Sequence, residues 1–285
     1  MNILILYLAW VIPHFITKTV KPMAFLSNGP EFTGSLGNMS FYKMKGTDKI
    51  VVRKKGGASK EQIKTLPAFA RTRENNAEFS GCANTVKSIR NALFPLNKLA
   101  DYNFTPTLTT LAKNIQLLDN VNERGKRAVN FSQYRYLLEG FQLNKDIIFD
   151  SVVKYPLKGT IERETGSATI DIPHLHPQLN LEFPWKAPLY RFVIGFGVFT
   201  DSAYNGANYK DKIILPRANT VYTDWQPVQQ AFEAQVFTLQ LNSLSGIDDT
   251  KSMLLSIGIQ MGTPITNAFI QEVKYASCAK ILTVG

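Results

Sequence analysis

The sequence is poor in the residues that most often carry chemistry. Its 285 residues include two cysteines and three histidines, and it contains no G-x-S-x-G, H-E-x-x-H or C-x-x-C sequence and no EF-hand loop. Cys82 falls in a predicted helix and Cys278 in a predicted strand, so we expect two buried free thiols rather than a disulfide framework. These absences predict a protein that is not an enzyme and needs no cofactor.

The apolar run at the amino terminus, residues 3–16, is shorter than the roughly 20 residues that span a bilayer core, so no transmembrane span is predicted. A signal peptide has a run of this length, but it also has a basic segment before the run and an A-x-A-like site after it. Residues 1–22 are therefore a poor signal or anchor, a buried or interfacial segment, or an over-extended reading frame that should start at Met23. We expect a cytoplasmic protein, or an exported one if residues 1–22 act as a signal.

Charged residues make up only 19% of the chain, against 45% hydrophobic residues, which excludes global disorder. The net charge of +10 is unevenly distributed. Residues 43–98 contain 13 Lys or Arg against four Asp or Glu, whereas residues 159–285 contain nine against eleven. A polyanion partner would therefore bind the 43–98 segment; the alternatives are a solvated basic surface or one neutralised by the acidic C-terminal part.

In the front half, β-prone runs at residues 39–44 and 50–55 flank a Gly-containing connection and predict a hairpin. A helix is predicted from an N-cap at Thr65 to about residue 93, with a kink or a division at Gly81. Its expected core stripe is Phe79, Cys82, Val86, Ile89 and Leu93, with the basic residues on other faces.

A second helix is predicted to start at Thr105, because Pro follows at the next position, and to bury Leu108, Leu111, Ile115 and Leu118. A mixed helical segment is expected at residues 133–141.

After residue 156 the hydrophobic pattern changes to alternation. The expected strands are residues 160–163, 168–172, 189–199, 233–241, 253–261 and 269–284. On the last of these, Phe269, Val273, Tyr275 and Ile281 are expected to share one face. Such runs, separated by Gly and Pro, predict an antiparallel sandwich of about seven or eight strands.

The fold class is therefore α+β: a basic N-terminal β-hairpin with helices, followed by an antiparallel immunoglobulin-like β-sandwich. The predicted organisation is an apolar terminal segment and loop (1–33), a basic hairpin and helical region (34–157), and the β-sandwich domain (158–285).

At the front of the chain, Gly34–Gly46 and Val51–Gly57 carry G-x-x-G and K-K-G-G sequences; the C-terminal half contains Phe192–Tyr204, Met253–Ile259 and Ala279–Leu282. Together these stretches resemble an uncharacterised protein family of Bacteroidota. The resemblance extends from about Gly34 onward and implies a β-rich C-terminal half. No activity is assigned to that family, so it implies no role for any residue.

Three short patterns suggest ligand sites. Gly56–Lys60 lacks the spacing of a phosphate-binding loop and predicts a Gly-rich turn, with an anion-binding nest as the alternative. Gly34–Gly37 has the G-x-x-G sequence of a KH-domain loop, but no predicted helix precedes it, so a KH domain is rejected. His174 and His176 point the same way if they lie on a strand and form a weak metal-site candidate, with Asp171 as a third ligand; surface histidines are the preferred interpretation.

The basic segment supplies the remaining candidates. Basic side chains neutralise phosphates, and an exposed aromatic residue stacks on a base. Phe41 and Tyr42 are the stacking candidates, and since strand residues alternate, at most one of them should point outward. The polyanion-binding candidates are Lys43, Lys45, Lys49, Arg53, Lys54, Lys55, Lys60, Arg71 and Arg73.

Three functions are compatible with these patterns. The first is a non-enzymatic structural or interaction protein that binds a protein partner or self-associates. The second is a nucleic-acid or polyanion-binding protein that uses the 43–98 segment. The third is a secreted or surface β-sandwich module that would present Trp185, Tyr222 and Trp225 to a ligand.

Overall fold

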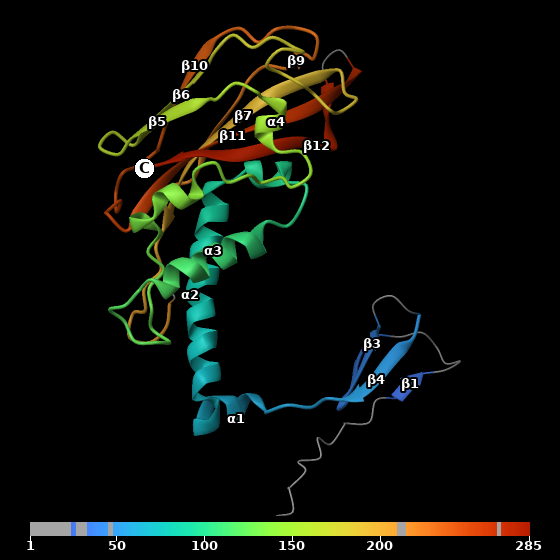
Figure 1. The fold of residues 1–285 in the computed structure, drawn as a ribbon, viewed down its shortest axis with the longest axis vertical. Helices are drawn as coiled ribbons and strands as arrows, with labels where there is room; N and C mark the ends of the chain where they lie inside the picture. Colours follow the sequence, from blue (N-terminus) through green and yellow to red (C-terminus); the bar gives the residue numbers. More distant parts are fainter. Residues whose placement is uncertain (1–23, 27–32, 45–47, 210–214, 267–268) are drawn as a thin grey trace, which may run out of the picture. The chain divides into compact units, whose positions relative to one another are not determined.

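The structure is a computed structural model, and it describes residues 24–26, 33–44, 48–209, 215–266 and 269–285. It combines helices with three antiparallel sheets, and the mixed α+β prediction is confirmed. The chain divides into two compact units, residues 1–65 and 66–285 (Figure 1). The predicted apolar segment 1–22 and Lys45 lie outside the described residues.

The first unit is a four-stranded antiparallel sheet followed by a short helix. The elements are β1 (Ala24–Leu26), β2 (Gly34–Leu36), β3 (Met39–Lys43), β4 (Ile50–Lys54) and α1 (Lys60–Thr65). The strand order is β1-β4-β3-β2, and Lys43 of β3 lies opposite Ile50 of β4.

Helix α1 begins at a capping box. The backbone N–H of Gln62 donates to Ser59 Oγ, and the backbone N–H of Ser59 donates to Gln62 Oε1. Thr65, the predicted N-cap of the long helix, is instead the last residue of α1, and its hydroxyl donates to the carbonyl of Glu61.

The second unit contains the two long helices and the other two sheets. Its helices are α2 (Ala70–Ala92), α3 (Thr105–Leu117) and the one-turn α4 (Phe149–Val152), with 3-10 turns at Pro67–Phe69, Leu96–Leu99, Phe131–Gln133 and Arg135–Leu138. Its strands are β5 (Lys158–Glu162), β6 (Ser167–Ile172), β7 (Leu189–Thr200), β8 (Asn219–Tyr222), β9 (Gln226–Pro227), β10 (Gln235–Gln240), β11 (Lys251–Thr266) and β12 (Phe269–Val284).

These strands form two sheets, β10-β6-β5 and β12-β11-β7-β8, the latter extended by β9 beside β7. The sheets pack face to face because alternate residues of each strand are apolar and point between them. On β7 this face comprises Tyr190, Phe192, Ile194, Phe196 and Val198, and all five are buried in one core with residues of β6 and β10.

The other face of the larger sheet packs against α2 and the 3-10 turns at Leu96–Leu99, Phe131–Gln133 and Arg135–Leu138, and α3 packs against α2. Figure 1 shows α2 meeting this sheet at one end. Val193 and Phe199 of β7 point into this second core, where they meet the buried stripe of α2, namely Cys82, Val86, Ile89 and Leu93. Because the helices share a core with the sheet, the compact unit runs from residue 66 to 285, and its boundary does not coincide with the expected one at 157/158. Phe79, which was expected in the stripe, is 60% exposed.

Helix α2 approaches β7 closely at Gly197. A Cβ atom at this position would lie 2.5 Å from the carbonyl oxygen of Ala92 and 2.7 Å from its Cα. Farther along the helix, the ring of Tyr209 occupies the space beside Gly81, 2.7 Å from where a Cβ would lie. This glycine therefore admits an aromatic ring, and α2 is continuous through it.

Strand β12 departs from simple alternation. Gln260 of β11 pairs with Ser277, and Gly262 pairs with Glu272, so four residues of β12 lie opposite one residue of β11. Within this bulge Tyr275 has a φ of 61° and is 80% exposed. The expectation that the apolar residues of β12 share one face is therefore wrong, because the bulge reorients those before residue 276.

Both cysteines are buried free thiols, as expected. Among the helices that the structure describes, none is long and apolar enough to cross a membrane.

The contact at Gly197 predicts a specific loss of stability. Gly197→Ala should lower the free energy of unfolding by about 1–3 kcal/mol, because the new methyl group meets backbone atoms that cannot rotate away. Chemical denaturation of the full chain measures this change, with Thr160→Ala on the exposed edge of β5 as a control expected to stay within about 0.5 kcal/mol. A Gly197→Ala midpoint equal to that of the parent chain would contradict the close contact.

Candidate functional site

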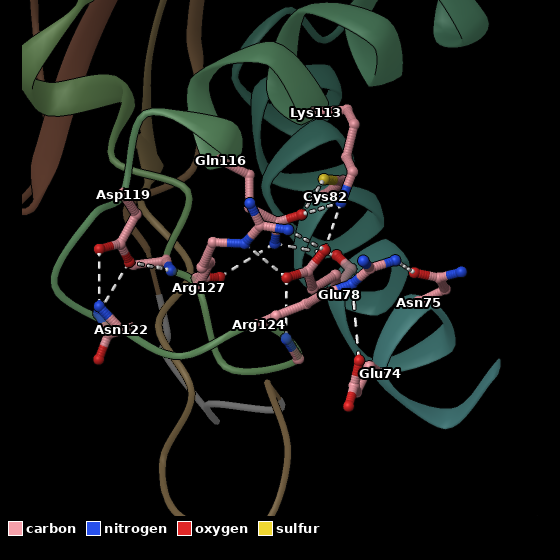
Figure 2. Close-up of polar contacts among 12 residues, drawn as sticks. Glu74, Asn75, Glu78, Cys82, Lys113, Gln116, Asp119, Asn122, Arg124 and Arg127 are labelled. Atoms are coloured by element: carbon pink, nitrogen blue, oxygen red, sulfur yellow. Dashed lines mark hydrogen bonds and ion pairs between the residues drawn. The ribbon is translucent and has the colours of Figure 1, made fainter. Parts of the chain in front are cut away.

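One cluster of ionisable groups surrounds the buried carboxylate of Glu78 on α2 (Figure 2). Oε1 of Glu78 accepts from the backbone N–H of Gly125 at 2.9 Å and from Nε of Arg127 at 2.7 Å. Oε2 accepts from Nζ of Lys113 at 2.5 Å and from Nη2 of Arg127 at 3.0 Å. Each oxygen therefore has two donors, and α2, α3 and the 119–128 loop are joined through one side chain.

This cluster stabilises structure and offers no free acid or base. Burial alone would raise the pKa of Glu78, but the hydrogen bonds from Arg127, Lys113 and Gly125 outweigh it and lower the pKa to about 2. The carboxylate is thus ionised and fully paired at neutral pH. Burial also raises the pKa of the neighbouring Cys82 to about 11, so this thiol is not a nucleophile at neutral pH.

The second feature is a groove along the carboxyl-terminal half of α2. One hollow of about 800 Å³ lies between α2, the end of β7 and the segment 215–218. A second hollow of about 720 Å³ continues toward β8. Both are lined by Phe94, Asn97, Arg217 and Ala218, so the two hollows form one continuous depression, which we call the α2 groove.

Four cationic side chains line the α2 groove. Lys87, Arg90 and Lys98 come from α2 and the turn that follows it, and Arg217 comes from the connection between β7 and β8. The guanidinium of Arg90 lies 5.3 Å from the ring centre of Phe104 and donates to the hydroxyl of Thr105, which holds it in place.

Asp201 is the single carboxylate among the described lining residues of the groove. Burial raises its pKa, and it accepts from the backbone N–H and the hydroxyl of Ser132. The described lining residues of the groove therefore carry a net positive charge.

Two aromatic side chains are exposed in the α2 groove. Phe94 lines both hollows and is 55% exposed, and Tyr222 lines the second hollow and is 39% exposed. Polar groups of α2 lie between the cations: Asn84 donates to the carbonyl of Tyr209, and the hydroxyl of Ser88 accepts from the backbone N–H of Thr200. The groove thus combines cations, amides and exposed rings on one side of α2.

The basic candidates of the first unit lie on and beside its sheet. Phe41 is buried and Tyr42 is exposed, and the guanidinium of Arg53 lies 5.3 Å from the centre of the Tyr42 ring. Lys43 forms an ion pair with Asp48 at 2.7 Å, and Lys55 donates to the carbonyl of Gly37. The side chains of Lys49, Lys54 and Lys60 are exposed, and Lys45 lies outside the described residues.

Arg71 and Arg73 belong to the second unit and have partners there. Arg71 pairs with Glu74 at 2.8 Å, and Arg73 donates to the carbonyl of Leu66. The structure therefore does not bring the nine basic candidates together on one sheet.

The two histidines lie side by side, with ring centres 4.7 Å apart, and Nδ1 of His174 lies 3.3 Å from a carboxylate oxygen of Glu233. The part of the chain that the structure describes contains no group of three His, Cys, Asp or Glu side chains that could hold a metal ion. Asp171, the third ligand considered from the sequence, pairs through its backbone with Val236 and Lys158.

The aromatic residues considered for a surface module are only partly accessible. Trp185 packs against the core between the two sheets. Trp225 and Tyr222 hold the guanidinium of Arg191 between them, at 4.3 and 4.4 Å from their ring centres.

Two signals for these sites were present in the sequence. Lys87 and Arg90 are three residues apart on the predicted helix, and Phe94 follows four residues later. Glu78 lies four residues before Cys82 and therefore falls on the buried stripe. No local pattern connects Arg217 to α2, because the contact joins distant parts of the chain.

Comparisons of the chain with protein-family models, with characterised proteins and with solved structures find no match. The resemblance to a Bacteroidota family stays a prediction.

The Glu78 cluster predicts how stability depends on pH. The pKa of Glu78 is lower in the folded chain than in the unfolded chain, so its contribution is present above the unfolded value near 4.5 and is lost as the pH falls toward 2. Glu78→Gln should cost about 3 kcal/mol at pH 7, because Arg127 and Lys113 lose their shared anion, and little at pH 2–3.

Urea denaturation at a series of pH values measures this difference. Glu123→Gln is the matched control. Glu123 lies on the same loop as Arg127, and its carboxylate forms a solvent-exposed ion pair with Lys126, with 3.0 Å between Oε2 and Nζ. Its effect should be below about 1 kcal/mol at every pH. A Glu78→Gln loss that stays the same from pH 7 to pH 2.5 would contradict the ionised, paired carboxylate.

Proposed function

We propose that this chain is a non-enzymatic binding protein and that its ligand is single-stranded nucleic acid held in the α2 groove. The observation that carries the proposal is that Arg217 lines the same hollow as Lys87, Arg90 and the exposed Phe94. Cations from separate parts of the chain thus share one hollow with an exposed ring, and such a combination neutralises phosphates while a base stacks.

The size of the groove supports a single strand rather than a duplex. Hollows of about 800 and 720 Å³ have the volume of sites for small molecules and for single nucleotides. A ring such as that of Phe94 stacks only on a base that is not already stacked and paired in a helix.

The two sheets of the second unit support an immunoglobulin-like arrangement as part of this proposal. Their strand orders, β5-β6-β10 and β12-β11-β7-β8, correspond to A-B-E and G-F-C-C′ of that fold. In this correspondence the groove lies where the C–C′ connection meets α2, and α2 packs on the outer face of the G-F-C sheet. The remaining functional interpretations, a protein-docking role and a surface module, lack a comparable convergence of side chains.

Binding of a fluorescein-labelled oligothymidine 20-mer to the full chain tests the proposal. Anisotropy should rise at 50 mM salt, and the logarithm of the association constant should fall with the logarithm of salt with a slope of about −3, since four contacts contribute about −0.7 each. Lys87→Gln/Arg217→Gln should weaken binding at least about fivefold and reduce the slope by about 1.4. Lys158→Gln, an exposed cation on β5, should change neither.

The first unit provides a separate basic surface, and its contribution to oligonucleotide binding is measurable in the same assay. Arg53→Gln/Lys54→Gln/Lys55→Gln should reduce the salt slope by about 2 if the sheet contacts the same strand. An effect of this triple variant without an effect of Lys87→Gln/Arg217→Gln would place the ligand on the first unit and contradict the groove. The absence of any anisotropy change with the parent chain at 50 mM salt would reject the function.

A further inference from the structure

At the far end of the α2 groove, Lys98 of the groove lining and the neighbouring Arg191 converge on one carboxylate of the chain itself. Nζ of Lys98 lies 3.0 and 3.1 Å from the two oxygens of Glu272, and Nη2 of Arg191 lies 3.1 Å from Oε1 of the same side chain. Lys98 and Tyr222 line the groove, and Glu272 is held beside them by the pairing of β12 with Gly262 of β11.

Arg191 is positioned independently of Glu272. Its guanidinium donates to Oε1 of Gln260 at 2.9 and 2.7 Å and lies between the rings of Tyr222 and Trp225. It therefore keeps its orientation and most of its partners if the carboxylate moves away. A guanidinium fixed in this way is a preorganised site for an oxyanion.

Glu272, by contrast, is weakly held. Its side chain and that of Lys98 are each 44% exposed, and ion pairs with this exposure contribute little net free energy because water screens them. A phosphate carries the same charge and offers more acceptor oxygens, so it can replace the carboxylate at Lys98 at small cost.

We propose that Lys98 and Arg191 form a phosphate subsite at the Tyr222 end of the α2 groove, and that Glu272 occupies this subsite until a strand displaces it. The inference rests on the proposed function, and it identifies where one backbone phosphate of the strand binds. Glu272 acts as an internal competitor: it lowers affinity for polyanions and keeps Lys98 and Arg191 neutralised in the free chain.

The competition predicts a gain of affinity on removing an acidic side chain. Glu272→Gln keeps an oxygen acceptor for Arg191 but removes the charge, so the oligothymidine 20-mer should bind about three- to fivefold tighter at 50 mM salt. The salt slope should change by less than about 0.7, the value of one phosphate contact, because the strand contacts Lys98 in both chains. Glu182→Gln controls for the general loss of a negative charge, since Glu182 also pairs with an exposed lysine, Lys154, and does not line the groove.

A double-mutant cycle separates local competition from a general charge effect. In a Lys98→Gln background the gain from Glu272→Gln should fall toward that of Glu182→Gln, because one of the two blocked cations is absent. Thermal melting of each variant, expected within a few degrees of the parent, confirms that the fold is intact.

The outcomes distinguish this inference from the function on which it rests. Binding by the parent chain with no gain in Glu272→Gln, or the same gain with and without Lys98, overturns the subsite and leaves the proposed function in place. Binding by Glu272→Gln alone would reject the proposed function of the parent chain and would contradict displacement of Glu272 by the strand. No binding by either chain rejects both.

Discussion

The backbone of α2 touches the surface of β7 at Gly197, and the position of the helix follows from this contact. Because Gly197 has no side chain, the carbonyl of Ala92 lies directly on the strand. Ser88 can then accept from the backbone N–H of Thr200 at 3.1 Å. The amino-terminal part of the helix is fixed through Glu78, whose carboxylate binds donors from α3 and from the 119–128 loop. With its apolar stripe facing the sheet, α2 leaves its polar side to line the groove.

Much of the β region was predictable from its alternation. The run at residues 189–199 buries every second residue of β7 against the other sheet because the period of a strand is two. Alternation did not reveal that α2 approaches the strand at Gly197, inside this run. The bulge around Tyr275 was not predictable from the sequence. It places four residues of β12 opposite one residue of β11, and this register depends on the pairing of the two strands and not on the local pattern of residues. The two-residue strand β9 is too short to give any periodic signal.

The site was predictable only in its helical half. The basic excess of residues 43–98 was evident from composition, but the structure distributes it between two compact units. Lys87 and Arg90 fall outside the apolar stripe, as helical periodicity requires. Arg217 and Tyr222 reach the same groove from the other end of the chain, through a connection whose path no local propensity specifies. Sequence patterns report which face of an element is buried, and a groove between elements depends on how those faces meet.

Net charge overstates what a ligand would encounter, because the fold neutralises part of the basic excess internally. Lys113 and Arg127 are already paired with Glu78, and Lys98 is paired with Glu272 from the acidic C-terminal part. The two pairings differ in kind. The first is buried and has no acceptor capacity left, so it stabilises the fold. The second is half-exposed and lies at the end of a groove, where an incoming anion can compete for the cation. Ion pairing therefore holds the fold together at Glu78 and, in the function we propose, adjusts access to the groove at Glu272.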